Sequence, residues 1–394
     1  MVVAWGSRTC GVCKVPNGVQ KTITNNVLRC FCTTCGESYT LPLLEIKKKV
    51  IYLDQNFFSS LIKDNNNSFI NLVVQKLQGL SSKQLIICPY SELHDFESHL
   101  ISNGSELFKA IKLMSRGKRF YLSSQIKERQ ILNAYRSFLK KGSNIYNLQL
   151  YEAIEPGVHD WTPSWLIDTN FTLTNLKSPS IIREEKELFA THFIEALPKF
   201  HETRISLMDL FKKEVRAQAK CLMQNYLRVK NSVDIDEIVN SEELRIISAM
   251  MSIDNEPKDD TYKIQQILIF LTSSYFENIP YIHIASGLWA AKIKEIASGS
   301  MPSNFEKQKE LMRGFSNDIE HMSVFAPYCD AMLTEKTLMK YSNRWRTESS
   351  SLYKFNVYSV DNKEALMKYL DSIEDSVTRE MKEELKIAYD IIVN

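Results

Sequence analysis

The sequence predicts an α/β fold in which a short parallel sheet is flanked by helices, with a large helical insertion and an N-terminal metal-binding ribbon. Three observations predict it. Residues 50–53 form an apolar run, rich in β-branched and aromatic types, that an acid follows at once. Two Cys-x-x-Cys pairs lie within the first 35 residues. Residues 105–260 show helical patterning without the strand–helix alternation on either side of them.

Composition indicates a globular protein. The chain has 394 residues, 44% hydrophobic and 24% charged, which suffices for more than one domain. No apolar run approaches the about 20 residues of a membrane span, and the first residues lack the basic start and apolar core of a signal peptide. We therefore expect a cytoplasmic protein. Residues 1–49 carry a net charge of +5, whereas the whole chain carries +2, so the rest of the chain is negative. A basic segment beside an acidic body suits a polyanionic partner.

The N-terminal cysteines have the spacing of a zinc ribbon. The two pairs are 18 residues apart, and each predicts a turn whose thiolates converge on one tetrahedral Zn²⁺. The expected ligands are Cys10, Cys13, Cys32 and Cys35, and the zinc is structural because four thiolates leave no open position. Cys30 could replace a ligand, but we favour an orientation away from the metal. Disulfides are the alternative, which the absence of a signal peptide disfavours.

The first expected strand of the sheet is residues 50–53. Its continuous apolar pattern is typical of a parallel strand that is covered on both faces. Asp54 follows where the strand leaves the sheet, and open α/β sheets place their ligand sites in the crevice outside the carboxyl ends of strands. The alternative is that Asp54 only caps the helix that begins near Asn56. A further helix is expected at 69–80.

A second strand is expected at 85–88. An acid-rich helix start follows it, so Glu92 becomes a second carboxylate near the same sheet edge. The long middle part of the chain predicts helices at 105–114, 122–141, 181–197, 202–230 and 236–251, and a packed loop at 151–180. Its basic cluster at Arg116, Lys118 and Arg119 favours a solvated helix face over a nucleic-acid contact, and His159 favours a structural or surface role.

The last third of the chain returns to mixed structure. Helices are expected at 261–279 and 282–297, strands at 331–334 and 355–358, and an amphipathic helical tail at 362–392. Asn317 and Glu320 have the spacing of a variant capping box, which predicts that a helix starts there. Asp318 would then lie in its first turn, with His321 one turn later. Glu335 follows the third strand and Asp330 precedes it.

Acids at strand ends and helix starts now number at least four. Clustered carboxylates repel one another, so they persist most readily where a divalent cation neutralises them. Mg²⁺ and Mn²⁺ prefer oxygen ligands, and they can activate water for phosphodiester hydrolysis. The candidates are Asp54, Glu92, Asp318 and either Asp330 or Glu335.

These segments resemble the PIN-domain nucleases, which include toxin ribonucleases and flap-endonuclease relatives. The matching pieces, in chain order, are 50–56, the second strand with Glu92 and Leu93, 317–321 and 329–336. The resemblance implies a PIN-like parallel sheet flanked by helices, with acids that hold Mg²⁺ or Mn²⁺ for cleavage of RNA or sometimes DNA.

The resemblance also implies individual roles. Asp54, Glu92 and Asp318 would take the central acid positions and ligate the metal, and Glu335 or Asp330 would complete the set. Asn56 and His321 would contact phosphate or support the acids. Two features depart from the family: Gln55 stands where members commonly have Thr, and 226 positions separate Glu92 from Asp318, so a large insertion must fold out from the sheet.

The expected domains are a zinc ribbon at 1–45, the first half of the PIN-like domain at 46–104, a helical insertion at 105–260, and the second half with C-terminal helices at 261–394. The expected function is that of a metal-dependent endonuclease whose partner is nucleic acid, RNA in the first place, in a toxin or defence setting. A homo-oligomer or a regulatory partner is also expected. The alternative is a non-catalytic nucleic-acid-binding or adaptor protein on a degenerate PIN-like scaffold, and a phosphatase is a weaker third option.

Overall fold

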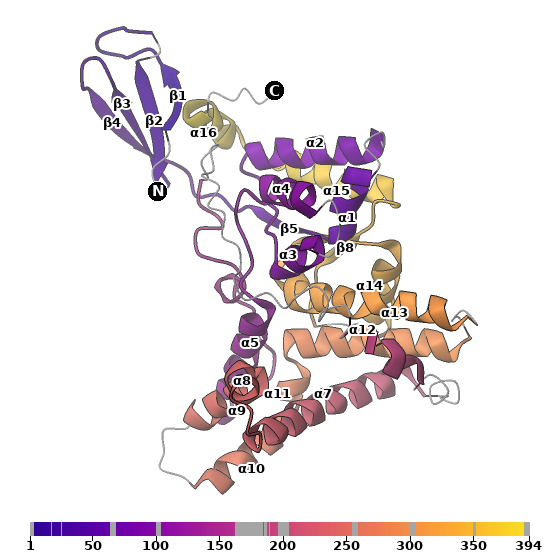
Figure 1. The fold of residues 1–394 in the computed structure, drawn as a ribbon. Coiled ribbons are helices and arrows are strands. Elements are labelled where there is room, and N and C mark those ends of the chain that lie inside the picture. Colours follow the sequence, from indigo (N-terminus) through magenta and orange to yellow (C-terminus); the bar gives the residue numbers. More distant parts are fainter. Residues whose placement is uncertain are drawn as a thin grey trace.

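The computed structural model describes residues 4–16, 18–24, 26–63, 68–99, 104–161, 184, 187–188, 190–195, 205–253, 259–299, 304–349 and 352–389. These residues contain an antiparallel sheet at the N-terminus and a parallel sheet between layers of helices (Figure 1). The α/β class and the parallel sheet flanked by helices are therefore confirmed.

The N-terminal sheet packs on the C-terminal helix. Its strands pair antiparallel in chain order: β1 (Ala4–Arg8), β2 (Val19–Thr24), β3 (Val27–Cys32) and β4 (Ser38–Pro42). Figure 1 shows this ribbon beside α16 (Arg379–Tyr389). Cys30 and Leu385 belong to one apolar cluster, and the fully buried Lys21 donates from Nζ to the Ile387 carbonyl at 2.9 Å. The two ends of the chain are thus held together.

The second sheet is parallel throughout, with the order β6-β5-β7-β8. Its strands are β5 (Lys49–Leu53), β6 (Ile86–Ile87), β7 (Ala331–Leu333) and β8 (Asn356–Tyr358). β5 and β7 are direct neighbours, and Leu53 pairs with Leu333 although the whole middle of the chain separates them. Sequence segments before and after the helical region therefore build one sheet.

Both faces of this sheet are covered, which explains the continuous apolar strands. Along β5, Val50 and Tyr52 face one apolar core, whereas Ile51 and Leu53 face the other. The second core is closed by α1 (Gln55–Lys63), α2 (Ser68–Ser82), α4 (Gly104–Ser115) and α15 (Lys363–Glu374).

The first core is larger and is helical beyond the sheet. It is built by α5 (Ser123–Leu139), α7 (Leu207–Lys230), α9 (Glu242–Ile253), α10 (Asp260–Leu271), α11 (Ser274–Glu277), α12 (Pro280–Ala297), α13 (Phe305–Glu320) and α14 (Lys336–Ser349). α3 (Glu92–His99) adds Leu93 to it, and the short α8 (Ile235–Asn240) lies at its outer end.

The named elements described within 105–260 are all helical, as the patterning predicts. They do not stand clear of the sheet, however, because α4 covers one face and α5 and α7 share a core with Tyr52 on the other. The insertion boundaries thus stay a prediction. The helix expected at 181–197 is described only in part, and most of the loop expected at 151–180 lies outside the described residues.

The helix start expected at Asn317 is wrong. α13 begins twelve residues earlier at Phe305, where the Asn304 side chain accepts from the Lys307 N–H at 3.0 Å, and Asn317 lies in its last turn. The buried residues Met312, Phe315 and Ile319 have helical spacing, which indicates a helix that starts well before Asn317. The helix then widens into the fully buried π-helix η2 (His321–Phe325) and ends in the 3₁₀ turn η3 (Ala326–Tyr328), which contains Pro327.

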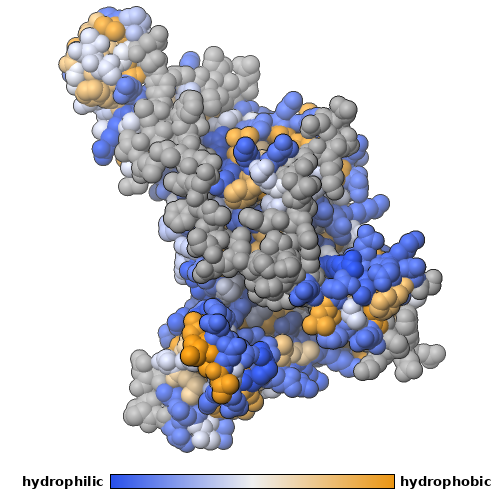
Figure 2. Space-filling view, in the orientation of Figure 1, coloured by the Kyte–Doolittle hydropathy of each residue, from blue (hydrophilic) through white to orange (hydrophobic). Residues whose placement is uncertain are grey.

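None of the described helices combines the length and the apolar character that crossing a membrane requires. The surface does carry an apolar cluster around α8, formed by Val233, Ile235 and Val239, which are 97%, 73% and 72% exposed. Figure 2 shows orange side chains gathered over this lower part of the molecule among blue polar ones. Such clusters are typical of contact surfaces. The expectation of a homo-oligomer or a regulatory partner stays a prediction.

We expect His283→Phe to flatten the loss of stability at acidic pH. The His283 ring lies 5.1 Å from Phe211 and 5.4 Å from Trp345, and burial lowers its pKa from 6.5 to about 4. Between pH 6.5 and pH 4 the His283 ring is therefore protonated in the unfolded chain and neutral in the folded chain. The free energy of unfolding falls by about 1.4 kcal/mol for each pH unit in this interval.

Urea unfolding at pH 7 and pH 5 measures this effect. The wild type should lose about 2 kcal/mol more than His283→Phe over that interval. His192→Phe, at an exposed position, is the control. An equal loss in wild type and His283→Phe would contradict the effect of burial on the His283 pKa.

Candidate functional site

Four cysteine sulfurs meet at the end of the ribbon. Those of Cys10, Cys13, Cys32 and Cys35 all lie within 4.8 Å of one another. Cys10 Sγ is 3.6 Å from Cys35 Sγ, and Cys13 Sγ is 3.6 Å from Cys32 Sγ. Tetrahedral zinc with Zn–S bonds of about 2.3 Å requires sulfurs about 3.8 Å apart. The four residues expected from the sequence could therefore hold a zinc ion, and Cys30 is not among them.

The backbone around each cysteine pair is shaped for metal binding. The N–H groups of Cys13 and Val12 lower the pKa of Cys10, and those of Cys35 and Thr34 lower the pKa of Cys32 to about 6. Both turns close in the same way, because Lys14 N donates to the Cys10 carbonyl and Gly36 N to the Cys32 carbonyl, each at 3.0 Å. Gly36 has a positive φ of 76° in the second turn, and Lys14 takes the same left-handed conformation in the first turn with φ 57°.

The carboxyl edge of the parallel sheet gathers acids. Asp54 is 2% exposed, its N–H donates to the Leu333 carbonyl at 2.9 Å, and its Oδ2 accepts from Thr334 Oγ1 at 2.7 Å. Glu335 is the next residue after Thr334. Burial, and after it the negative charge of Asp54, raise the pKa of Glu335, while Lys292 acts in the opposite direction. Asp54 and Glu335 are thus neighbours, as the order of strands predicts.

A third acid, which the sequence reasoning did not select, comes from α3. Gln55 Nε2 donates to Ser98 Oγ at 3.4 Å, so the residues that follow Asp54 and Glu97 are joined by a hydrogen bond. Asn317 Nδ2 donates to Glu97 Oε1 at 2.9 Å, which brings the last turn of α13 to the same place. The half-buried Asp318 is the next residue after Asn317. α3 is therefore bonded to the residue after Asp54 through Ser98 and to the helix that carries Asp318 through Glu97.

A buried polar chain ends beside Glu97. Ser91 Oγ and Tyr52 Oη are 2.7 Å apart, Tyr52 Oη is bonded to His321 Nδ1, and His321 Nε2 lies 4.0 Å from Glu97 Oε2. Burial raises the pKa of Tyr52 well above 10, so its hydroxyl keeps its proton. When Ser91 donates to Tyr52 and Tyr52 to His321 Nδ1, the remaining His321 proton sits on Nε2 and faces Glu97. At 4.0 Å this approach is longer than a hydrogen bond, and His321 Nε2 has no hydrogen-bond partner in the described residues.

His94 fixes α3 to the end of β5. Its Nδ1 accepts from the Ser91 N–H at 3.0 Å and its Nε2 donates to the Leu53 carbonyl at 2.7 Å. Burial, and then the neighbouring His321, lower the pKa of His94 to about 3, so the ring is neutral. This histidine ties the residue before Asp54 to the helix that carries Glu97, and no periodic pattern in the sequence indicates this role.

Glu92 has other partners than the predicted ones. Its Oε1 accepts from the Ser123 N–H at 2.6 Å, which caps the start of α5. Burial raises the pKa of Glu92, and so does Glu320, which pairs with Lys127 at 2.7 Å. The structure thus places Glu92 against the start of α5, and its role as the second acid beside Asp54 stays a prediction. Five positions along a helix turn the side chain by about 140°, which is why Glu92 and Glu97 serve different surroundings.

Asp330 lies at the other edge of the sheet. It pairs with Lys49 at 2.7 Å and accepts from the Val50 N–H at 2.9 Å, at the amino end of β5. Since the rest of β5 spans about 13 Å, Asp330 lies far from Asp54, and of the two candidates for the fourth acid only Glu335 lies at the carboxyl edge. The predicted phosphate contact Asn56 is exposed in the first turn of α1.

The carboxylates are close without forming a closed cage. Within the part of the chain that the structure describes, no three of them bring oxygens within 4.8 Å of one another. Mg²⁺ commonly keeps several waters and uses one or two protein carboxylates together with substrate phosphates. The spacing of the described carboxylates therefore does not fit an all-protein cage of the kind that Ca²⁺ uses.

Comparisons with known proteins identify no relative of this chain. No protein-family model matches the chain, and neither a curated protein nor a solved structure is significantly similar to it. The function is therefore argued from the residues at the carboxyl edge.

Proposed function

We propose that this protein is a metal-dependent nuclease of PIN-like fold that cleaves RNA at the carboxyl edge of the parallel sheet, and that it acts in the cytoplasm. The observation that carries the proposal is the convergence of acids from distant segments at one strand end. Asp54 and Glu335 are neighbours there, Glu97 lies on the helix whose Ser98 accepts from the residue after Asp54, and Asp318 follows Asn317, which bonds to Glu97. Acids so placed are costly unless cations balance them.

The donor set suits hard divalent cations. Carboxylate oxygens are the preferred ligands of Mg²⁺ and Mn²⁺, and either ion, when bound, would activate water and neutralise charge on a phosphodiester. The chain itself orients the acids. Thr334 holds one oxygen of Asp54, Asn317 holds one oxygen of Glu97, and His321 faces the other. The second oxygen of Asp54 would thereby remain for ions and water.

Cleavage assays test the proposal. The purified protein is incubated with Mn²⁺ and labelled RNA or DNA, beside Asp54→Asn, Glu335→Gln and Asp330→Asn. We expect RNA cleavage by the wild type, strong loss with Asp54→Asn and Glu335→Gln, and retained cleavage with Asp330→Asn, the control at the other edge. Absence of cleavage by the wild type, or equal cleavage by Asp54→Asn, would refute the nuclease.

A second candidate is a non-catalytic nucleic-acid-binding or adaptor protein. It is favoured by the open spacing of the carboxylates and by the diversion of Glu92 to a helix cap. Divalent-cation binding distinguishes the two, because a scaffold has no need to retain it. RNA binding without Mn²⁺ binding at the carboxyl edge would support the adaptor.

A further inference from the structure

A histidine nitrogen faces a carboxylate oxygen between η2 and α3. His321 Nε2 lies 4.0 Å from Glu97 Oε2, and the His321 side chain is only 1% exposed. Nε2 has no hydrogen-bond partner in the described residues, although buried polar atoms of folded proteins rarely lack one. What Nε2 can bind depends on whether it carries a proton or a lone pair.

His94 determines where the protons of the buried polar chain lie. Its Nε2 donates to the Leu53 carbonyl at 2.7 Å, because a carbonyl only accepts. Its Nδ1 accepts from the Ser91 N–H at 3.0 Å, because an N–H only donates. The His94 ring is therefore neutral, with a lone pair on Nδ1. Ser91 Oγ lies 3.2 Å from this lone pair, so the Ser91 hydroxyl donates to it.

The direction of the remaining bonds follows from this proton. Since the Ser91 hydroxyl proton points to His94, Ser91 Oγ accepts from Tyr52 Oη at 2.7 Å. The single proton of the Tyr52 hydroxyl is then used, so Tyr52 Oη accepts from His321 Nδ1. This is the reverse of the arrangement in which Ser91 donates to Tyr52. A neutral His321 now has its lone pair on Nε2, and two acceptors face each other across 4.0 Å.

No basic side chain balances the negative charge of Glu97. Its Oε1 accepts from the uncharged Asn317 amide at 2.9 Å, and no lysine or arginine pairs with it in the part of the chain that the structure describes. Burial raises the pKa of Tyr52, and the charges of Asp54 and Glu97 raise it further, so two carboxylates act on one buried hydroxyl. A cation between Nε2 and Oε2 would therefore be more favourable than a neutral water molecule.

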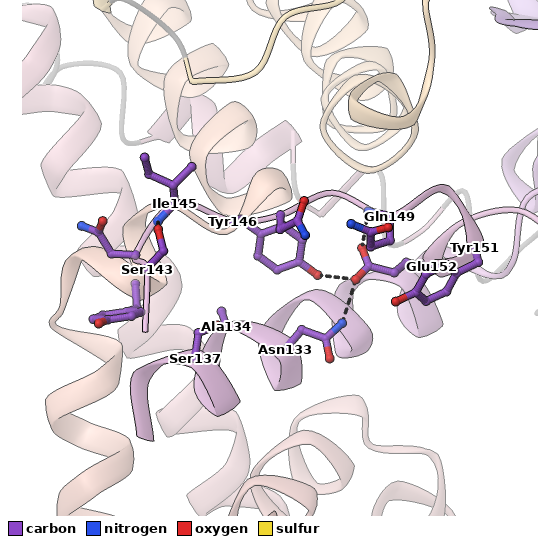
Figure 3. Close-up of a pocket in the computed structure, with 12 residues that line it drawn as sticks. Asn133, Ala134, Ser137, Ser143, Ile145, Tyr146, Gln149, Tyr151 and Glu152 are labelled. Carbon is purple, nitrogen blue, oxygen red and sulfur yellow. Dashed lines mark hydrogen bonds between the residues drawn. The ribbon is translucent and has the colours of Figure 1, made fainter. Parts of the chain in front are cut away.

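The buried Glu152 shows the contrasting case of a carboxylate that the chain itself satisfies (Figure 3). Asn133 Nδ2 donates to Glu152 at 2.7 Å, Tyr146 Oη at 3.1 Å and Tyr328 Oη at 3.0 Å. These three neighbours are all donors, so the cavity of about 270 Å³ beside Glu152 is the weaker candidate for a cation. Glu97 differs because it faces an acceptor.

We infer that His321 Nε2 and Glu97 Oε2 bind one divalent transition-metal ion in preference to Mg²⁺. Metal bonds of about 2.0–2.2 Å to each atom span separations of up to about 4.2 Å, so one ion reaches both. Imidazole nitrogen is a ligand of transition metals, whereas Mg²⁺ prefers oxygen. Tyr52 would orient the ring by accepting from its other nitrogen, as the partners of metal-bound histidines do.

Water and phosphate oxygens would complete the shell of the ion, because no third Cys, His, Asp or Glu of the described residues joins this pair within 4.8 Å. The inference rests on the proposed function in that Glu97 is one of the acids assigned to its metal site. It adds a nitrogen ligand to that site and names the class of ion.

Pulsed EPR of the zinc-loaded full chain with one equivalent of Mn²⁺ tests the inference. Mn²⁺ is paramagnetic and competes poorly for the thiolates of the ribbon. We expect coupling of Mn²⁺ to an imidazole nitrogen in the wild type and none in His321→Phe. Isothermal titration should show Mn²⁺ binding weakened at least about tenfold in His321→Phe, with Mg²⁺ binding changed less than about twofold, because only the nitrogen ligand is lost.

His283→Phe is the matched control. His283 is also a buried histidine, but its neighbours are the aromatic rings of Phe211 and Trp345, so its loss should leave the nitrogen coupling and the Mn²⁺ affinity unchanged. Glu97→Gln, at a side chain that is 20% exposed, is the second variant should His321→Phe fail to fold. It is expected to lose the same coupling.

Three results would overturn the inference. They are a wild type without nitrogen coupling, equal Mn²⁺ binding by wild type and His321→Phe, and nitrogen coupling retained in Glu97→Gln. Each is distinct from failure of the nuclease. Cleavage of RNA with Mg²⁺ by a protein without nitrogen coupling would keep the nuclease and refute the inference, whereas nitrogen coupling without cleavage would keep the inference and refute the nuclease.

Discussion

Replacing Cys32 and Cys35 together by serine is expected to abolish zinc binding and to unfold the ribbon. The two sulfurs are half of the set that lies within 4.8 Å, and a sheet of four short strands has little apolar core of its own. Binding of structural zinc supplies about 10–16 kcal/mol in comparable small modules, so its loss exceeds what the remaining contacts provide. The zinc content measured by elemental analysis should fall from one ion per chain to none.

The same variant should loosen the C-terminal helix. Lys21 and Cys30 connect the ribbon to α16, so amide exchange should accelerate in residues 4–42 and also in 379–389. Cys30→Ser, on the same strand and the same buried face, is the matched control and should keep its zinc. Full zinc occupancy of the Cys32→Ser, Cys35→Ser double variant, or a wild type without zinc, would contradict the assignment.

Asp54→Asn and Glu97→Gln are each expected to lower Mn²⁺-dependent RNA cleavage by at least about 10²-fold. A divalent cation contributes several kcal/mol to phosphodiester hydrolysis, and each 1.4 kcal/mol is about a factor of ten. The double variant should be scarcely worse than either single one, because residues that act as a unit are not additive. Single-turnover cleavage rates at saturating Mn²⁺ measure both effects.

Glu92→Gln is the matched control on the same helix. It removes a charge that caps α5, so we expect about 1 kcal/mol of lost stability and little loss of cleavage. The opposite pattern, with Glu97→Gln harmless and Glu92→Gln inactive, would return the second acid to the residue that the sequence motif indicates. Full additivity of the Asp54 and Glu97 effects would indicate that they do not share one site.

The sequence predicted what local chemistry determines. The strand at 50–53 was recognisable because both of its faces are buried, and the ribbon because zinc imposes a cysteine spacing. Asp54 and Glu335 come just after strands β5 and β7 in the chain. Parallel pairing of these two strands is therefore enough to bring both acids to one edge of the sheet.

What the sequence left undetermined depends on side-chain direction and on long-range contacts. The choice between Glu92 and Glu97 rests on the rotation of α3, which His94 sets through its bond to Leu53. Asn317 resembles a helix start locally, yet its amide is taken by Glu97, a partner 220 positions away. The π-helix that turns His321 inward follows from burial on all sides, and no local pattern predicts it.

Mn²⁺ binding to the zinc-loaded protein is the measurement that tests the central claim most directly. Isothermal titration should show Mn²⁺ binding to the wild type and to Asp330→Asn, with binding lost or weakened at least about tenfold in Asp54→Asn, since each carboxylate removed takes a ligand from the ion. Equal Mn²⁺ binding by wild type and Asp54→Asn would contradict a metal site at the carboxyl edge of the sheet.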